Sequence, residues 1–220
     1  MTNLEVVDWG LIDYQEALEK QLALVERVAE DSSLAPGYLI FCTHPPIVTL
    51  GRATKEGDVQ TWSGPVIEIS RGGRATYHGP SQLVIYPIVN LKIERRNRKA
   101  QEVHGFLRDF EEAIVKVLND YGLQGQGRSL QKKLNTEFME EETGVWLGHR
   151  KLASLGLAIK KWVTFHGAAV NVDLDPTAFQ GLKPCGFSPS TMISLEEALK
   201  HKVDRQELQK KLIDELLKKL

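Results

Sequence analysis

The segment of residues 145–172 constrains the fold most, because it holds several short apolar runs joined by very short turns. Gly148-His149-Arg150 separates the first run from the second, and Lys160-Lys161 separates the second from the third. Turns this short join strands that run in opposite directions. The segment therefore predicts an antiparallel meander, with strands at 145–147, 151–159, 162–165 and 168–172.

A sheet built on this meander needs helices to cover it, and three segments carry apolar side chains at helical spacing. They are residues 14–30, 99–121 and 194–220. In the last segment, the pair Ser194 and Glu197 and the pair Asp204 and Glu207 have the spacing of capping boxes, which mark the starts of helices.

Further short strands are expected at 38–42, 47–50, 66–69 and 82–91, and Pro87 in the last of these indicates an edge strand or a bulge. Together these segments predict an α+β fold, in which a mixed, largely antiparallel sheet is flanked by helices. The length fits one domain over residues 1–220 with a C-terminal helical segment at about 194–220, although the last ~45 residues could form an appended subdomain.

Composition and charge exclude several classes of protein. The chain has 28 basic and 29 acidic residues and a formal net charge of −1, without the basic excess that is typical of nucleic-acid-binding proteins. No apolar run approaches the ~20 residues of a membrane span, and the N-terminus lacks the pattern of a signal peptide. Two distant cysteines fit a compartment in which thiols stay reduced. We therefore expect a cytoplasmic protein that binds neither nucleic acid nor membranes.

Cys185 is the residue best suited to nucleophilic chemistry. It lies between Pro184 and Gly186, in a turn that can present its sulfur to a ligand. A free thiol has a pKa near ~8.5 and needs a base or a cation to become a thiolate at neutral pH. Lys151 and the histidines are the candidates. Cys42 ends an apolar strand and is interpreted as a packed thiol, and no metal site is expected because no second pair of residues has the spacing of metal ligands.

Three further motifs contain residues that could bind a ligand. Residues 71–80 hold three glycines, two arginines and a histidine after a strand, which favours a ligand-binding loop over a hairpin with solvated arginines. Lys151 lies in a run of small and apolar residues, and the sequence favours a solvent-facing side chain over one aimed at a thiol. His166 could be a hydrogen-bonding residue, a base or a satisfied polar group in the core, and the last of these is favoured.

Several motifs, in this order and at this spacing, resemble those of the lipoyl(octanoyl) transferases over about residues 40–195. They are His44-Pro45-Pro46 with Thr49-Leu50-Gly51, Arg71-Gly72-Gly73-x-x-Thr76-Tyr77-His78-Gly79-Pro80, Lys151-Leu152-Ala153-Ser154-Leu155-Gly156, Phe165-His166-Gly167 and Pro184-Cys185-Gly186.

The resemblance implies the fold of the biotin and lipoate protein ligases and a defined reaction. The family moves an octanoyl group from acyl carrier protein to a lysine of lipoyl domains, in 2-oxoacid dehydrogenase E2 subunits and the glycine cleavage H protein, as the first step of lipoate biosynthesis. It implies no ATP, metal or other cofactor. Arg71 and Arg74 could also steer acidic carrier proteins from the rim of the site.

The resemblance also assigns roles to residues of this chain. Cys185 corresponds to the acyl-accepting nucleophile, and Lys151 to the residue that lowers the pKa of the thiol and moves protons. His166 is a candidate for a supporting hydrogen bond. The substrate-binding residues would be Arg71, Gly72, Gly73, Arg74, Ala75, Thr76, Tyr77, His78, Ser154, Leu155, Gly156, Gly167, Ala168 and Ala169.

Three other functions remain open on the sequence. An ATP-dependent lipoate or biotin ligase would share the fold but would not need Cys185. A non-catalytic module could bind lipoyl domains or carrier protein. A cysteine hydrolase would need a histidine partner for the thiol, for which His166 is the candidate.

Overall fold

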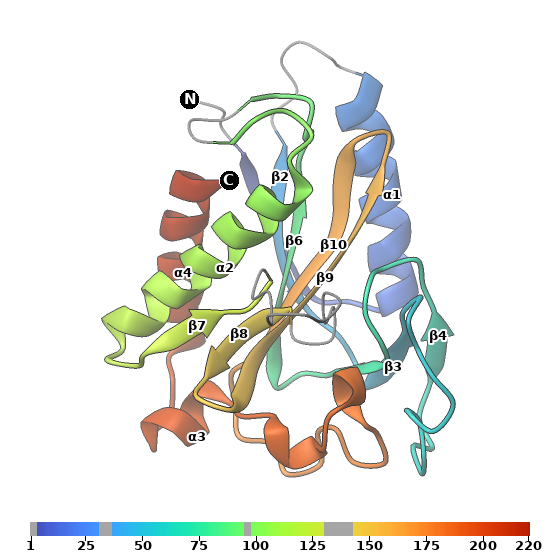
Figure 1. The fold of residues 1–220 in the computed structure, drawn as a ribbon, viewed down its shortest axis with the longest axis vertical. Helices are drawn as coiled ribbons and strands as arrows, with labels where there is room; N and C mark the ends of the chain where they lie inside the picture. Colours follow the sequence, from blue (N-terminus) through green and yellow to red (C-terminus); the bar gives the residue numbers. More distant parts are fainter. Residues whose placement is uncertain (1–3, 31–36, 95–97, 130–142) are drawn as a thin grey trace, which may run out of the picture.

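The computed structural model describes residues 4–30, 37–94, 98–129 and 143–220, which build a seven-stranded sheet with helices on both faces (Figure 1). Only the first two strands in the order are parallel to each other, and the other neighbours are antiparallel. Across the sheet the order is β1 (Glu5–Leu11), β2 (Tyr38–Thr43), β6 (Gln82–Ile88), β10 (Val163–Asn171), β9 (Arg150–Lys160), β8 (Gly144–Leu147) and β7 (Gly125–Gly127).

A smaller sheet of three strands lies beside the large one. Its order is β4 (Val66–Glu68), β3 (Ile47–Leu50) and β5 (Thr76–His78). Four α-helices and two short 3₁₀ turns complete the described part of the chain. The helices are α1 (Tyr14–Glu30), α2 (Val103–Asp120), α3 (Leu195–Leu199) and α4 (Arg205–Lys219), and the 3₁₀ turns are Pro184–Gly186 and Pro189–Thr191.

The central strands are buried on both faces, and their side chains alternate between two apolar clusters. On β2, Leu39 and Phe41 join the cluster under α2 and α4, whereas Tyr38, Ile40 and Cys42 join the cluster under α1. This alternation follows from the two-residue period of a strand. Because both faces need apolar residues, β2 and β6 appear in the sequence as continuous apolar runs.

The C-terminal helices begin where the capping boxes predict. The Ser194 side chain accepts a hydrogen bond from the Glu197 backbone N–H, and the Asp204 side chain accepts from Gln206 and Glu207. The apolar stripe of α4 packs against α2 and shares the main core of the sheet through Leu208, Leu212, Leu216 and Leu220.

The predicted α+β class, the three helical segments and the antiparallel meander are confirmed, with three differences. The expected strands at 162–165 and 168–172 are one continuous strand, β10. The helix expected from residue 99 begins at Val103. Strands β1, β5 and β7 were not predicted, because their residues show no strong apolar alternation. Pairing with neighbouring strands defines them.

Pro87 is not in an edge strand, because β6 lies between β2 and β10 in the interior of the sheet. The register between β6 and β10, continued from Ala168–Ile85 and from Val163–Asn90, places Pro87 opposite His166. Proline has no N–H to donate, so the ladder is interrupted at this pair and resumes on both sides. The proline therefore interrupts the hydrogen bonding between two interior strands and does not mark the edge of the sheet.

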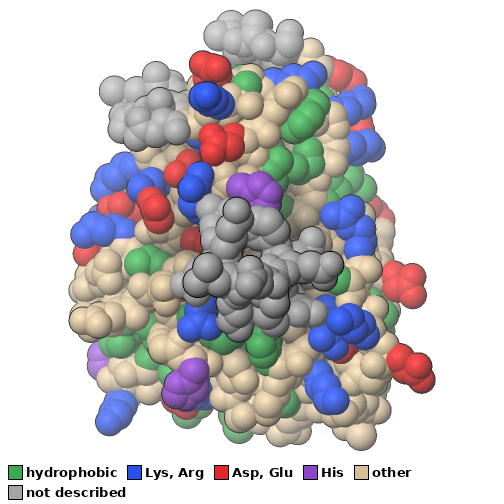
Figure 2. Space-filling view, viewed as in Figure 1, with side chains coloured by type: hydrophobic (Ala, Val, Ile, Leu, Met, Phe, Trp, Pro, Cys, Tyr) green, Lys and Arg blue, Asp and Glu red, His purple; other side chains and the backbone are tan. Residues whose placement is uncertain are grey.

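The face shown in Figure 2 carries basic and acidic side chains close together, in keeping with the net charge of −1. Lys219 of α4 pairs with Glu112 of α2 at 2.7 Å, and Lys116 pairs with Asp120 at 3.5 Å. Among the described residues, none of the helices combines the length and apolar character needed to cross a lipid bilayer.

Candidate active site

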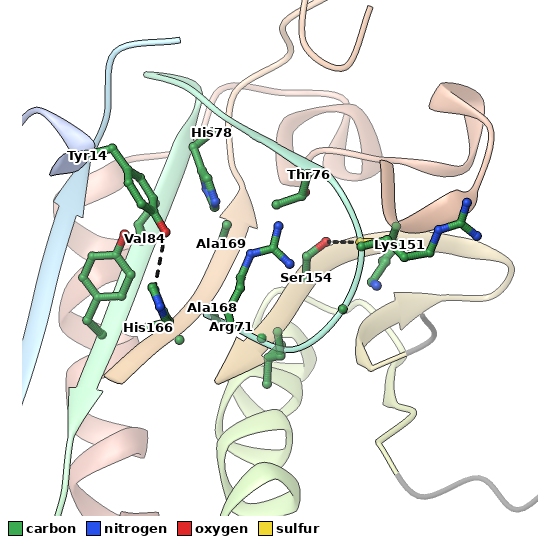
Figure 3. Close-up of a pocket in the computed structure, with 17 residues that line it drawn as sticks. Tyr14, Arg71, Thr76, His78, Val84, Lys151, Ser154, His166, Ala168 and Ala169 are labelled. Atoms are coloured by element: carbon green, nitrogen blue, oxygen red, sulfur yellow. Dashed lines mark hydrogen bonds between the residues drawn. The ribbon is translucent and has the colours of Figure 1, made fainter. Parts of the chain in front are cut away.

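A cavity lies between the loop that follows β4, strands β6, β9 and β10, and the 3₁₀ turn that carries Cys185 (Figure 3). Its lining contains most of the residues that the sequence proposes for the site. The lining residues are Tyr14, Arg71, Gly73, Arg74, Thr76, His78, Val84, Tyr86, Lys151, Ser154, Leu155, Gly156, His166, Gly167, Ala168, Ala169 and Cys185.

Gly72, Ala75 and Tyr77, which the resemblance places among the substrate-binding residues, do not line this cavity. Gly72 donates its N–H to the Leu157 carbonyl at 3.1 Å, which holds the loop on β9. Ala75 accepts the Cys185 N–H at 2.8 Å. Tyr77 packs away from the cavity against Phe179, with ring centroids 5.4 Å apart. These three residues hold the walls of the cavity in place.

Small residues on β9 and β10 form the floor of the cavity. Gly156 pairs with Gly167 in the ladder, and Ala168 and Ala169 follow on β10. A Cβ on Gly156 would lie 3.1 Å from the Gly72 carbonyl oxygen, and a Cβ on Gly167 would collide with the Ile85 carbonyl. Glycine is therefore needed at Gly167, where the strand β6 lies too close for any side chain, whereas at Gly156 a side chain would make a tight contact with the loop.

Cys185 adopts the left-handed conformation, with φ 53° and ψ 24°, inside its short 3₁₀ turn. Its Sγ lies 3.8 Å from the Ser154 Oγ, and 8% of the residue is exposed. Gly186 is also left-handed, and a Cβ there would collide with the Arg74 guanidinium. The Pro-Cys-Gly sequence thus allows a tight turn that directs the sulfur into the cavity.

Lys151 does not face solvent, contrary to the expectation from its sequence setting, since only 1% of it is exposed. The reason is a bulge in β9. Val145 pairs with Ala153, but Trp146 pairs with Lys151, so Leu152 is an extra residue in the strand. A bulge resets the alternation of side chains, so Lys151 and Ser154, three positions apart, both line the cavity. The Lys151 ammonium lies 5.5 Å from the Trp146 ring centroid.

Burial alone would raise the pKa of the Cys185 thiol, but the neighbouring groups outweigh it. The positive charges of Lys151 and Arg71, with hydrogen bonds from Ser154 and Lys151, hold the pKa of Cys185 below its usual value. The site therefore favours a thiolate, which is the nucleophilic form of cysteine.

Arg71 is buried, and the Arg74 side chain is only 15% exposed and is held in an ion pair, so the geometry argues against the expected steering role. Arg71 is 6% exposed, and its Nη2 donates to the Thr49 carbonyl at 2.9 Å and to the Thr49 hydroxyl at 2.8 Å. The Arg74 guanidinium forms a two-point ion pair with the buried Asp58 carboxylate. Arg71, held by Thr49, thus places a fixed positive charge in the lining of the cavity.

Sequence reasoning missed an aromatic cluster at the other side of the cavity. Tyr14 and Tyr86 line it, and the His44 ring lies 5.0 Å from that of Tyr14. His44 Nδ1–H donates to the Ile12 carbonyl at 2.8 Å, so its Nε2 accepts from the Tyr86 hydroxyl at 2.8 Å. Burial lowers the pKa of His44. The sequence did carry a signal for this cluster: Tyr14 stands at the start of a helix, and Tyr86 stands within an apolar strand.

Comparisons with a family model and with curated proteins agree on one family. The family model described as lipoyl protein ligase A/B catalytic domain matches residues 13–217. An octanoyltransferase of Bdellovibrio bacteriovorus is 53% identical over 221 residues, covering 100% of both chains. An octanoyltransferase of Cytophaga hutchinsonii is 37% identical, covering 96% of this chain and 90% of its own.

Solved structures show the same fold at low sequence identity. A bipartite lipoate protein ligase from Thermoplasma acidophilum matches with a TM-score of 0.68 and 18% identity, covering 100% of this chain and 84% of that one. The biotin protein ligase of Aquifex aeolicus with biotin and ATP matches with a TM-score of 0.56 and 15% identity, covering 100% and 72%. The fold is therefore that of the lipoate and biotin protein ligases. The chain belongs to the lipoyl protein ligase A/B catalytic domain family and, within it, to the octanoyltransferases.

Proposed function

We propose that this octanoyltransferase carries the octanoyl group as a thioester on Cys185, between octanoyl-acyl carrier protein and a lysine of a lipoyl domain. The acceptors would be lipoyl domains of 2-oxoacid dehydrogenase E2 subunits and the glycine cleavage H protein, in the cytoplasm. One observation supports this best: the Cys185 thiol, whose pKa is lowered by Lys151 and Arg71, lines a cavity whose floor is made of the small residues of β9 and β10.

In the first step, Lys151 accepts the proton of the Cys185 thiol. The thiolate attacks the carbonyl carbon of the octanoyl thioester, the bond to the carrier sulfur breaks, and the carrier thiolate leaves with the proton from Lys151. The position of Lys151 supports this step, because its charge and its hydrogen bond both lower the pKa of Cys185.

In the second step, the uncharged amine of the acceptor lysine attacks the acyl-enzyme. An amide bond forms, the bond to Cys185 Sγ breaks, and Lys151 takes the proton that the new amide loses. The thioester donor is already activated, so neither step needs ATP. Dividing the transfer in two lets two protein substrates use one cavity in turn.

A negatively charged oxygen develops in each step and needs hydrogen-bond donors. The backbone N–H groups of the nucleophile turn are already engaged, since Cys185 donates to Ala75 and Gly186 donates to Lys183, each at 2.8 Å. We therefore assign this role to other groups that line the cavity. The Ser154 hydroxyl, 3.8 Å from the sulfur, is the first of them.

Intact-mass analysis after mixing with octanoyl-acyl carrier protein tests the proposal. We expect one octanoyl adduct, mapped to Cys185, which transfers to a lipoyl domain added afterwards. The matched control is Cys42→Val, which removes the other cysteine and should keep the adduct. Transfer without any adduct, or loading of free octanoate that depends on ATP, would contradict the thioester.

A further inference from the structure

Three aromatic rings close the end of the cavity opposite the nucleophile. In Figure 3, Tyr14, His78 and His166 lie on one side and Lys151 on the other, with Arg71 and Ser154 between them. The Tyr14 and His78 rings are stacked, with centroids 5.5 Å apart. An acyl chain bound at Cys185 would run along the small residues of β10 and end against these rings. This inference rests on the thioester proposed above.

His166 presents an unsatisfied polar atom at this end. The residue is 2% exposed, and its Nδ1 lies 3.4 Å from the Tyr14 hydroxyl. Its Nε2 has no hydrogen-bond partner among the described residues. A buried nitrogen of this kind needs water or a polar group, because leaving it unpaired is unfavourable. A terminal methyl group cannot satisfy it.

The backbone of His166 is also unusual. Its φ is 58°, in the left-handed region, within the long strand β10. It lies opposite Pro87, which has no N–H to donate, and its own N–H donates to the Gln21 side chain at 2.8 Å. Strained residues of this kind persist where the surrounding structure holds a side chain in a required direction. Here the strained backbone directs the imidazole at the cavity.

The ring is uncharged at neutral pH, because burial and the charge of Arg71 lower the pKa of His166 to about 3. A cysteine hydrolase would need His166 as the base for Cys185, and an imidazole with so low a pKa is a poor base. The low pKa also means that the end of the cavity is polar but neutral. Such a surface tolerates a short acyl chain beside it, whereas a longer chain would strip water from Nε2.

We propose that His166, held by Tyr14, is a specificity-determining residue that limits the acyl chain to the octanoyl length. A chain that stops short of the imidazole leaves Nε2 hydrated. Two further methylenes would occupy that place and leave the nitrogen unpaired. Polarity, rather than the size of the side chain, then sets the limit.

Two substitutions separate polarity from size. His166→Phe is larger and apolar, whereas His166→Asn is smaller and polar. The measurement is the ratio of the single-turnover acylation rates with decanoyl and octanoyl thioesters of pantetheine, followed by intact mass. We expect His166→Phe to raise this ratio roughly tenfold, the factor for burying two methylenes. His166→Asn should keep the wild-type ratio.

The opposite order would overturn the inference, because a steric limit predicts that the smaller asparagine accepts the longer chain. A ratio is internal to each variant, so partial loss of active protein does not affect it. If His166→Phe does not fold, as judged by its thermal unfolding, His166→Leu takes its place with the same expectation. If the His166→Phe variant forms the octanoyl adduct but its decanoyl-to-octanoyl ratio equals that of the wild type, only the role of His166 in chain length is overturned. Wild-type protein that forms no adduct with either thioester overturns the thioester as well.

Discussion

Cys42 and Cys185 are both buried, with 2% and 8% of their surfaces exposed, yet their surroundings give them opposite chemistry. Burial, with a smaller effect of the Asp8 charge, raises the pKa of Cys42 well above its usual range. At Cys185 the charges of Lys151 and Arg71 and the hydrogen bonds outweigh the burial, and the pKa falls. Burial therefore does not decide whether a thiol in this fold is inert; the placement of nearby cations does.

The local backbone accounts for this difference. Cys42 sits in β2, where the regular alternation directs it into the apolar cluster under α1. Cys185 sits in a left-handed turn, where its sulfur points into a cavity. A strand buries the side chain among apolar neighbours, whereas the turn brings it within reach of side chains from other elements.

The strongest test of the comparison is Cys185→Ala. We expect it to abolish the acyl-enzyme and to reduce octanoyl transfer by at least about a thousandfold, because no other thiol faces the cavity. Turnover with a lipoyl domain, followed by mass spectrometry, measures the loss. Residual transfer near the wild-type rate would mean that the octanoyl group passes directly between the two proteins.

Lys151→Met removes the charge and keeps most of the side-chain volume. We expect acylation at neutral pH to fall by about a hundredfold. Since Lys151 lowers the pKa of Cys185, the pH at which the thiol becomes reactive should rise in the variant. Alkylation rates measured against pH check this. Lys183→Met is the matched control, because Lys183 is exposed two positions before Cys185. An unshifted alkylation profile in Lys151→Met would contradict the proposed base.

Ser154→Ala should have a smaller effect, about tenfold on the acylation rate, because it removes one hydrogen bond near the sulfur and the developing oxyanion. Single-turnover acylation measures it. Ser190→Ala, at an exposed serine close to the same turn, should not change the rate. Equal rates for wild-type and Ser154→Ala would leave the oxyanion to other donors.

Cys42→Val should have the smallest effect. Because Cys42 acts as a packed apolar residue, a similar apolar side chain should change the free energy of unfolding by less than about 1.5 kcal/mol. Octanoyl transfer should stay within about twofold of wild type. Denaturant titration and turnover assays check both. The Cys42 Sγ also lies 3.6 Å from the His44 Nε2. A large loss of activity in a folded variant would mean that this contact matters for the cavity.

Local patterns in the sequence predicted a large part of the architecture. The apolar stripe of α1, the caps of α3 and α4, and the turns of the meander each depend on residues close together in the chain. The same holds for the turn around Cys185, since proline and glycine act on the backbone locally. Periodicity could not predict β1, because its side chains are mostly exposed and it forms by pairing with β2.

By itself, the sequence determined the helices, the meander, the likeness to one family and the residue best suited to be a nucleophile. The residue pattern around Lys151 favoured solvent, and only the resemblance paired this lysine with the thiol. The tertiary structure decided how a bulge turns Lys151 to the cavity, that Pro87 lies inside the sheet, and that His166 and Tyr14 close the far end of the cavity. Each of these depends on pairing between distant segments: an extra residue in β9 against β8, and a proline in β6 against β10. Register is a property of two strands together, so no pattern within one of them can reveal it.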